Sequence, residues 1–126
     1  MSAKYLFLFT GLSGLVSVAM GAFGAHALRG KIEESLLHAF ETAVTYQMSH
    51  TLALFGVCIL MQMWGGKPVL QYAAYGFILG IILFSGSLYG LALTGSKWLG
   101  PITPIGGLAF VAGWILLTYA MWEHAD

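Results

Sequence analysis

The sequence predicts an all-α integral membrane protein, a bundle of four helices that each cross the bilayer. Of its 126 residues, 59% are hydrophobic and only 8% are Asp, Glu, Lys or Arg, whereas about 25% are charged in a typical soluble domain. A soluble protein of this size has much surface for its volume and needs many polar side chains. The charged residues are also clustered, with long uncharged segments between the clusters. We treat residues 1–126 as a single membrane domain.

Four segments contain no Asp, Glu, Lys or Arg. They have 24, 25, 29 and 25 residues and cover 5–28, 42–66, 68–96 and 98–122. A helix rising about 1.5 Å per residue needs roughly 20 apolar residues to cross about 30 Å of hydrocarbon. The backbone must satisfy its own hydrogen bonds in lipid, and these segments show no period-2 alternation, so they predict helices rather than barrel strands. We place the spans at about 5–25, 42–64, 69–94 and 103–122.

The connection after the first span differs from the other two. Five of the ten charged residues lie between Arg29 and Glu41, and the helix-forming residues of 32–40 predict a short interfacial helix that could run into the second span. A solvated loop is an equal alternative. Glycine and proline at 65–68 and 99–101 predict tight turns for the other connections.

The first span resembles a signal peptide at its end, where His26 lies between two alanines. Its apolar stretch is longer than that of a signal peptide, so we expect the segment to be retained. An even number of spans places both termini on one side of the membrane. The Lys and Arg residues are divided almost equally between the two sides and favour termini outside only slightly.

Composition also limits the partners and cofactors. Lys plus Arg equals Asp plus Glu at five each, so there is no basic surface for nucleic acid. Cys58 is the only cysteine and is expected to be a small buried hydrophobe. The sequence contains no phosphate-binding loop, dinucleotide motif or nucleophile elbow. We therefore expect no cofactor and no enzymatic activity.

Small residues recur on one face of the first, third and fourth spans. Helices in lipid associate through close backbone approach and polar contacts, which small residues permit. The pattern predicts that these three helices touch closely, with large apolar side chains facing lipid. The glycines expected at the contacts are Gly14, Gly21, Gly76, Gly80, Gly90, Gly106 and Gly113.

Polar residues inside the second span form the main candidate site. Three of them lie within about 100° of the helix circumference, and polar groups in hydrocarbon should face the bundle interior. One histidine at the end of the first span lies at a similar depth, and the third span offers further hydroxyl groups. The predicted cluster comprises His26, Tyr46, Gln47, His50, Ser85, Ser87 and Tyr89.

Three interpretations of this cluster remain open. It could hold helices in register by hydrogen bonds, line a pocket or proton-linked path, or bind a metal. His38 and Glu41 have i, i+3 spacing, but His50 lies on the opposite side of a continuous helix. No zinc motif or cysteine pair is present, so we expect no metal site.

Four motifs together resemble a known family over nearly the whole chain. They are GAFGAH at 21–26, YQMSH at 46–50, FSGSLY at 84–89 and ITPIGG at 102–107. The chain resembles the bacterial domain-of-unknown-function family 423, whose eukaryotic relatives are called transmembrane protein 256. The resemblance implies a small multi-spanning membrane protein and no established activity.

The sequence therefore favours a non-enzymatic, multi-pass protein of the bacterial inner membrane with a structural or binding role. One alternative is a small-solute or proton-coupled carrier built from several copies; the absence of Asp and Glu from the predicted spans counts against it. A second alternative is a lipid-modifying enzyme with a histidine base. Membrane lipid is the expected partner, and assembly with further copies of the chain stays open.

Overall fold

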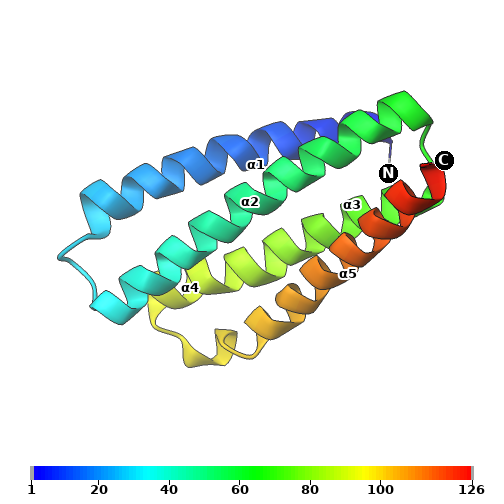
Figure 1. Cartoon of the computed structure of the whole chain (residues 1–126). Helices are drawn as coiled ribbons and strands as arrows, with labels where there is room; N and C mark the ends of the chain where they lie inside the picture. Colours follow the sequence, from blue (N-terminus) through cyan, green and yellow to red (C-terminus); the bar gives the residue numbers. More distant parts are fainter. Residues whose placement is uncertain (1, 126) are drawn as a thin grey trace.

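The computed structural model describes residues 2–125 as helices joined by short connections (Figure 1). The helices are α1 (Ala3–Phe23), α2 (Glu34–Trp64), α3 (Pro68–Gly80), α4 (Gly86–Thr94) and α5 (Ile102–His124). π-helical turns at Gly24–Leu28 and Ile81–Ser85 and a 3-10 turn at Lys97–Leu99 complete the helical structure. Four continuous helical segments, 3–28, 34–64, 68–94 and 97–124, are long and apolar enough to span a membrane. The predicted fold class is confirmed.

The second span is longer than predicted. α2 has 31 residues and is about 46 Å long at 1.5 Å per residue. It begins at Glu34, so most of 32–40, predicted as a short interfacial helix that could run into the second span, forms its first turns. Arg29 forms an exposed ion pair with Glu41, at 3.1 Å. Because α2 exceeds the roughly 30 Å of hydrocarbon, its charged first turns can lie outside the hydrocarbon.

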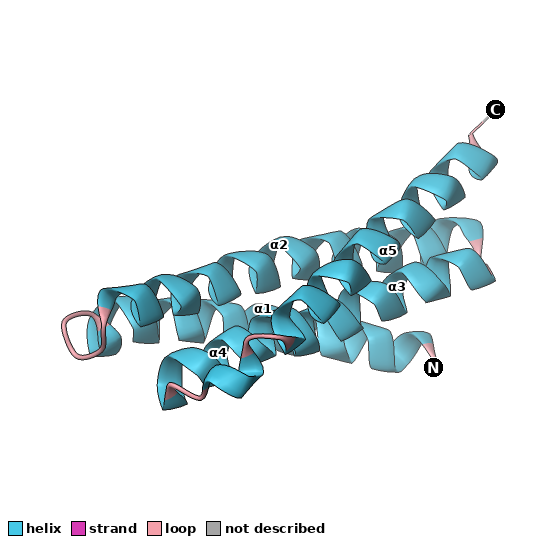
Figure 2. Ribbon diagram, turned by 90° about the horizontal axis from the view of Figure 1, so that it is seen from below, coloured by secondary structure: helices cyan, strands magenta, loops and turns pink. Residues whose placement is uncertain are grey.

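Glycine allows the chain to turn at each of the three connections. Gly30, Gly65 and Gly95 have φ values of 81°, 86° and 71°, a left-handed region that strains residues with a Cβ. No other residue in the described part of the chain has a positive φ. Pro68 then starts α3 at a position where its missing N–H is not needed. The helices and the loops between them are distinguished in Figure 2.

Each span packs mainly against its neighbours in sequence. α1 lies along α2, and α2 also contacts α3, α4 and the π-helical turn between them. α5 packs against α3 and the same turn. In Figure 1, α1 and α5 accordingly lie on opposite flanks, with α2, α3 and α4 between them. The largest side chains of the interior are Phe40, Phe77, Leu6, Leu54 and Leu70, while many large apolar side chains face outward, as expected for lipid contact.

The third and fourth spans touch as closely as their glycines predict. A Cβ on Gly76 would lie 3.0 Å from the Cα of Gly113 on α5. A Cβ on Gly106 would overlap the backbone of Phe84, and one on Gly80 would overlap the ring of Phe110. These glycines let backbone meet backbone, or backbone meet an aromatic ring, across the interface.

The predicted close contact of the first span with the third and fourth is wrong. α1 packs on α2 instead, and its glycines make only ordinary contacts there. A Cβ on Gly14 would lie 3.8 Å from Thr51, and one on Gly21 would lie 3.5 Å from Val44. Gly90 also differs, because the atom closest to a Cβ there belongs to the flexible side chain of Leu99. Hydrogen bonds of Ser13 with Thr51 and Gln47 instead link α1 to α2.

Both ends of the described chain lie at the end of the bundle that also carries the α2–α3 turn (Figures 1 and 2). The α1–α2 connection and the α4–α5 connection lie at the other end. This arrangement follows from four antiparallel crossings.

Candidate functional site

Gln47 connects three spans through its amide group. It extends from the middle of α2 and is 5% exposed. Its Nε2 donates to the Ser13 hydroxyl of α1 at 3.1 Å, and its Oε1 accepts a hydrogen bond from the Tyr89 hydroxyl of α4 at 2.6 Å. One side chain therefore joins the first, second and third spans.

A second hydroxyl pair fixes α1 to α2 beside Gln47. Ser13 and Thr51 lie 2.7 Å apart, oxygen to oxygen. Ser17, one turn along α1, donates to the Ser13 carbonyl at 2.8 Å, and Thr10 donates to the Leu6 carbonyl at 2.7 Å. The buried face of α1 is thus hydroxyl-bearing, and α2 supplies the side-chain partners of Ser13.

His50 joins α2 to α5. Its Nε2 lies 3.1 Å from the indole Nε1 of Trp114, and its Nδ1 lies 2.8 Å from the Tyr46 carbonyl. An indole N–H can only donate and a carbonyl can only accept, so Nε2 must accept and Nδ1 must carry the proton. The geometry assigns the neutral Nδ1–H tautomer, with both ring nitrogens satisfied.

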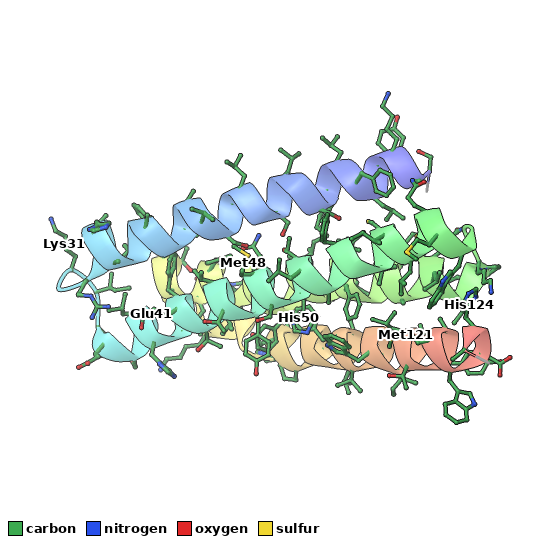
Figure 3. All side chains as sticks on the ribbon, turned by 45° about the horizontal axis from the view of Figure 1, so that its top comes forward. Lys31, Glu41, Met48, His50, Met121 and His124 are labelled. Atoms are coloured by element: carbon green, nitrogen blue, oxygen red, sulfur yellow. The ribbon has the colours of Figure 1, made fainter. Side chains whose placement is uncertain are left out.

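Aromatic rings surround the His50 imidazole. Phe110 stacks on it with ring centroids 3.6 Å apart and planes 14° apart, and Tyr46 stacks at 5.9 Å. Tyr46 contributes its carbonyl and its ring to this arrangement, while its side chain is 42% exposed and packs on Phe84. Figure 3 shows His50 between α2 and α5.

The serines of the third span anchor its central π-helical turn. Ser85, the last residue of that turn, donates to the Ala43 carbonyl of α2 at 2.8 Å. Ser87 shares a 2.5 Å hydrogen bond with Thr103 of α5. The two hydroxyls therefore bond to different neighbours, one on each side of the third span.

The structure does not bring His26 into the cluster. His26 lies in the π-helical turn that ends the first span and is exposed. Its ring has no hydrogen-bond partner among residues 2–125. A similar depth in the membrane does not bring His26 to the cluster, because its side chain is exposed on the surface of the π-helical turn.

Sequence reasoning missed three members of the cluster: Ser13, Thr51 and Trp114. Of these three residues, Trp114 was the easiest to predict from the sequence. The other tryptophans lie near helix ends, whereas this one is in the middle of the fourth span, where its N–H needs an acceptor. Ser13 could have been found from its i+4 spacing to Ser17.

The buried polar atoms of the cluster are paired within the chain. Among residues 2–125, no buried side-chain nitrogen or oxygen lacks a hydrogen-bond partner. The described residues also contain no group of three His, Cys, Asp or Glu side chains placed to hold a metal ion. The buried polar atoms can therefore fix helices relative to one another.

Fold and site together define a multi-pass α-helical membrane protein whose spans are linked by buried hydrogen bonds. The family model described as "Protein of unknown function (DUF423)" matches residues 20–107. The chain belongs to this family.

Relatives match over nearly the full length. The chain is 46% identical over 122 residues to a UPF0382 membrane protein of Staphylococcus aureus, covering 95% of this chain and 98% of that protein. It is 42% identical to the UPF0382 membrane protein YwdK of Bacillus subtilis, with 93% and 95% covered. It is 37% identical to the UPF0382 inner membrane protein YgdD of Escherichia coli K12, with 93% and 88% covered.

No solved structure gives a significant match. The relatives and the four apolar helices together show a multi-pass protein of the inner, or cell, membrane.

Proposed function

We propose that the protein is a non-enzymatic membrane component with a structural or binding role, and that its polar cluster holds the four spans in register. The observation that carries this proposal is the complete internal pairing of the buried polar side chains in residues 2–125. A catalytic or transport site needs at least one group that is available to a substrate or an ion. Here the buried donors and acceptors are used between helices or within one helix, as in the bond from Ser17 to the Ser13 carbonyl.

The state of His50 supports the structural role. A proton carrier must bind and release its proton, and protonating Nε2 would break the hydrogen bond from Trp114. Phe110 covers one face of the ring. The acidic residues of α2, Glu34 and Glu41, are exposed in its first turns and do not accompany His50. A histidine base for a lipid-modifying reaction would likewise need a free nitrogen.

Replacing His50 with Ala tests the proposal. The substitution leaves the Trp114 N–H without an acceptor and removes the ring that stacks on Phe110. We expect it to lower the free energy of unfolding by about 2 kcal/mol or more, measured by thermal or denaturant unfolding in detergent. In the same variant and the wild type, reconstituted into liposomes with an internal pH dye, proton flux should equal that of empty liposomes.

A wild-type flux that disappears in a normally folded His50→Ala variant would overturn the structural role. Trp122→Phe serves as the control for both assays, because Trp122 is 78% exposed and lies outside the cluster.

A further inference from the structure

α1 and α2 do not pack together along their whole length. A groove of about 570 Å³ lies between them, lined by apolar side chains such as Phe7, Leu15, Leu52 and Phe55. It extends along α2 from Met48 to Gln62, about 21 Å at 1.5 Å per residue. In Figure 3, Met48 lies on the side of α2 that faces α1, away from His50. The groove is therefore separate from the His50 ring and opens to the surrounding lipid.

Two glycines of the groove have no packing partner that explains them. A Cβ on Gly11 would meet nothing within 4 Å, and one on Gly14 would make only an ordinary contact at 3.8 Å. Glycine within a helix is less favourable than alanine, and Gly76, Gly80 and Gly106 permit close helix contacts that Gly11 and Gly14 do not make. Their effect here is to keep the groove deep.

The polar atoms at the floor of the groove are already bonded within the chain. Thr10 donates to the Leu6 carbonyl and contacts the Cys58 sulfur, and Thr51 pairs with Ser13. The occupant therefore meets methyl groups and apolar side chains. An apolar occupant fits such a lining without leaving a buried polar group unpaired.

The length and the apolar lining of the groove fit an acyl chain. Its 21 Å length runs parallel to the spans and covers about two thirds of a 30 Å hydrocarbon core. One end lies at Met48, near the middle of α2, and the other lies at Phe7 and Gln62, toward the end of the bundle that carries the termini.

Charge at the open end favours an anionic headgroup. Lys4 precedes Phe7 by three residues and Gly11 by seven, so it lies on the groove face of α1, one turn nearer the membrane surface. Lys4 is exposed, and the described residues give it no acidic partner, since their ion pair joins Arg29 and Glu41. Gln62 also lines the groove at this end and offers an amide to a lipid ester or phosphate.

We propose that the groove between α1 and α2 binds one acyl chain of an anionic membrane phospholipid, with its phosphate beside Lys4. This site is independent of the structural role of the polar cluster. It assigns α1 a binding surface in addition to its hydrogen bonds with α2.

The test fills the groove without disturbing the helix contact. Gly11→Leu combined with Gly14→Leu places side chains where a Cβ meets no close neighbour. The purified protein is delipidated in detergent, titrated with phosphatidylglycerol, and analysed by native mass spectrometry. The wild type should retain one phosphatidylglycerol, and the double variant should bind it at least about tenfold more weakly, as expected for the loss of roughly two buried methylenes.

Three further variants serve as a control, a second groove-filling test and a test of the headgroup contact. Gly86→Leu is the control, because Gly86 is exposed on the third span and a Cβ there meets nothing within 4 Å; binding should not change. Leu52→Trp also narrows the groove, and because Leu52 is exposed, the larger side chain should not disturb folding. If the double glycine variant does not fold, the lipid affinity of Leu52→Trp tests the site in its place. Lys4→Gln should remove the preference for phosphatidylglycerol over phosphatidylcholine.

Wild-type binding in the folded groove-filling variants would overturn the proposal. So would a change of oligomeric state without a change in lipid binding, since that would make a second copy of the chain the occupant. Unchanged headgroup preference in Lys4→Gln would overturn the assignment of the phosphate.

Discussion

At the scale of single residues, Gln47 has the most connected position in the bundle. Its amide accepts from Tyr89 on one side and donates to Ser13 on the other. Hydrogen bonds between membrane helices contribute about 0.6 kcal/mol on average, but a buried acceptor left unpaired costs more than the mean value of one bond. The loss of one partner should therefore be measurable.

Tyr89→Phe should lower the free energy of unfolding by about 1–2 kcal/mol, because it leaves the Oε1 of Gln47 without its donor. Unfolding in detergent, followed by circular dichroism, measures the change. Tyr119→Phe is the matched control: this side chain is 56% exposed, and removing its hydroxyl should change stability by less than about 0.5 kcal/mol. Equal effects of the two substitutions would contradict the role of the Gln47 hydrogen bond.

A double-mutant cycle isolates the bond between His50 and Trp114. Trp114→Phe and His50→Ala should each destabilise the protein, and their combination should cost less than the sum. The expected coupling is about 0.6–1.7 kcal/mol, the range found for hydrogen bonds between membrane helices. Additive effects in denaturant unfolding would mean that the two side chains do not support each other.

The residues of the cluster were only partly predictable. Gln47 and His50 could be identified because a polar side chain in an apolar span needs a partner. Which partners they would find could not be read from the sequence, since this depends on helix rotation and crossing. Hence His26 was included although it points outward, and Trp114 was missed although its N–H is the donor to His50.

At the scale of elements, the contact between the third and fourth spans depends on glycines with different tolerances. A Cβ at Gly80 overlaps the Phe110 ring, whereas at Gly90 it meets the tip of the Leu99 side chain. Gly80→Leu should therefore destabilise the bundle by several kcal/mol through overpacking, and Gly90→Leu by clearly less. Thermal unfolding in detergent ranks the variants, with Gly86→Leu as the neutral reference. A larger loss of stability in Gly90→Leu than in Gly80→Leu would contradict this difference between the two glycines.

Charge spacing predicted the helices, and small residues predicted the contact of the third and fourth spans. The partner of the first span was not predicted. The uncharged segments and the turn glycines locate the spans to within a few residues, apart from α2, whose polar first turns continue the helix. The small residues of the first span predicted the wrong neighbour. Small size permits close approach to any helix, whereas the hydroxyl groups of Ser13 and Thr51 specify one.

At the scale of the whole molecule, the four crossings place Ser2 and Ala125 on the same side of the membrane and Lys31 on the other. In a Cys58→Ala background, single cysteines at these three exposed positions can be labelled with a membrane-impermeant thiol reagent in oriented vesicles. Positions 2 and 125 should react together, and position 31 should react only from the opposite side. Labelling of positions 2 and 125 from different sides would exclude four crossings.

The neighbour-to-neighbour packing of the spans also bears on how the protein is made. As the chain leaves the ribosome, α1 and α2 can form a hairpin before the third span is synthesised, and α5 arrives when its main partner α3 is already inserted. Contacts between segments close in sequence form quickly because little chain entropy is lost in closing the loop. The hydrogen bond from Trp114 to His50 is then among the last to form. It joins α5 to α2 after the contacts between spans close in sequence have formed.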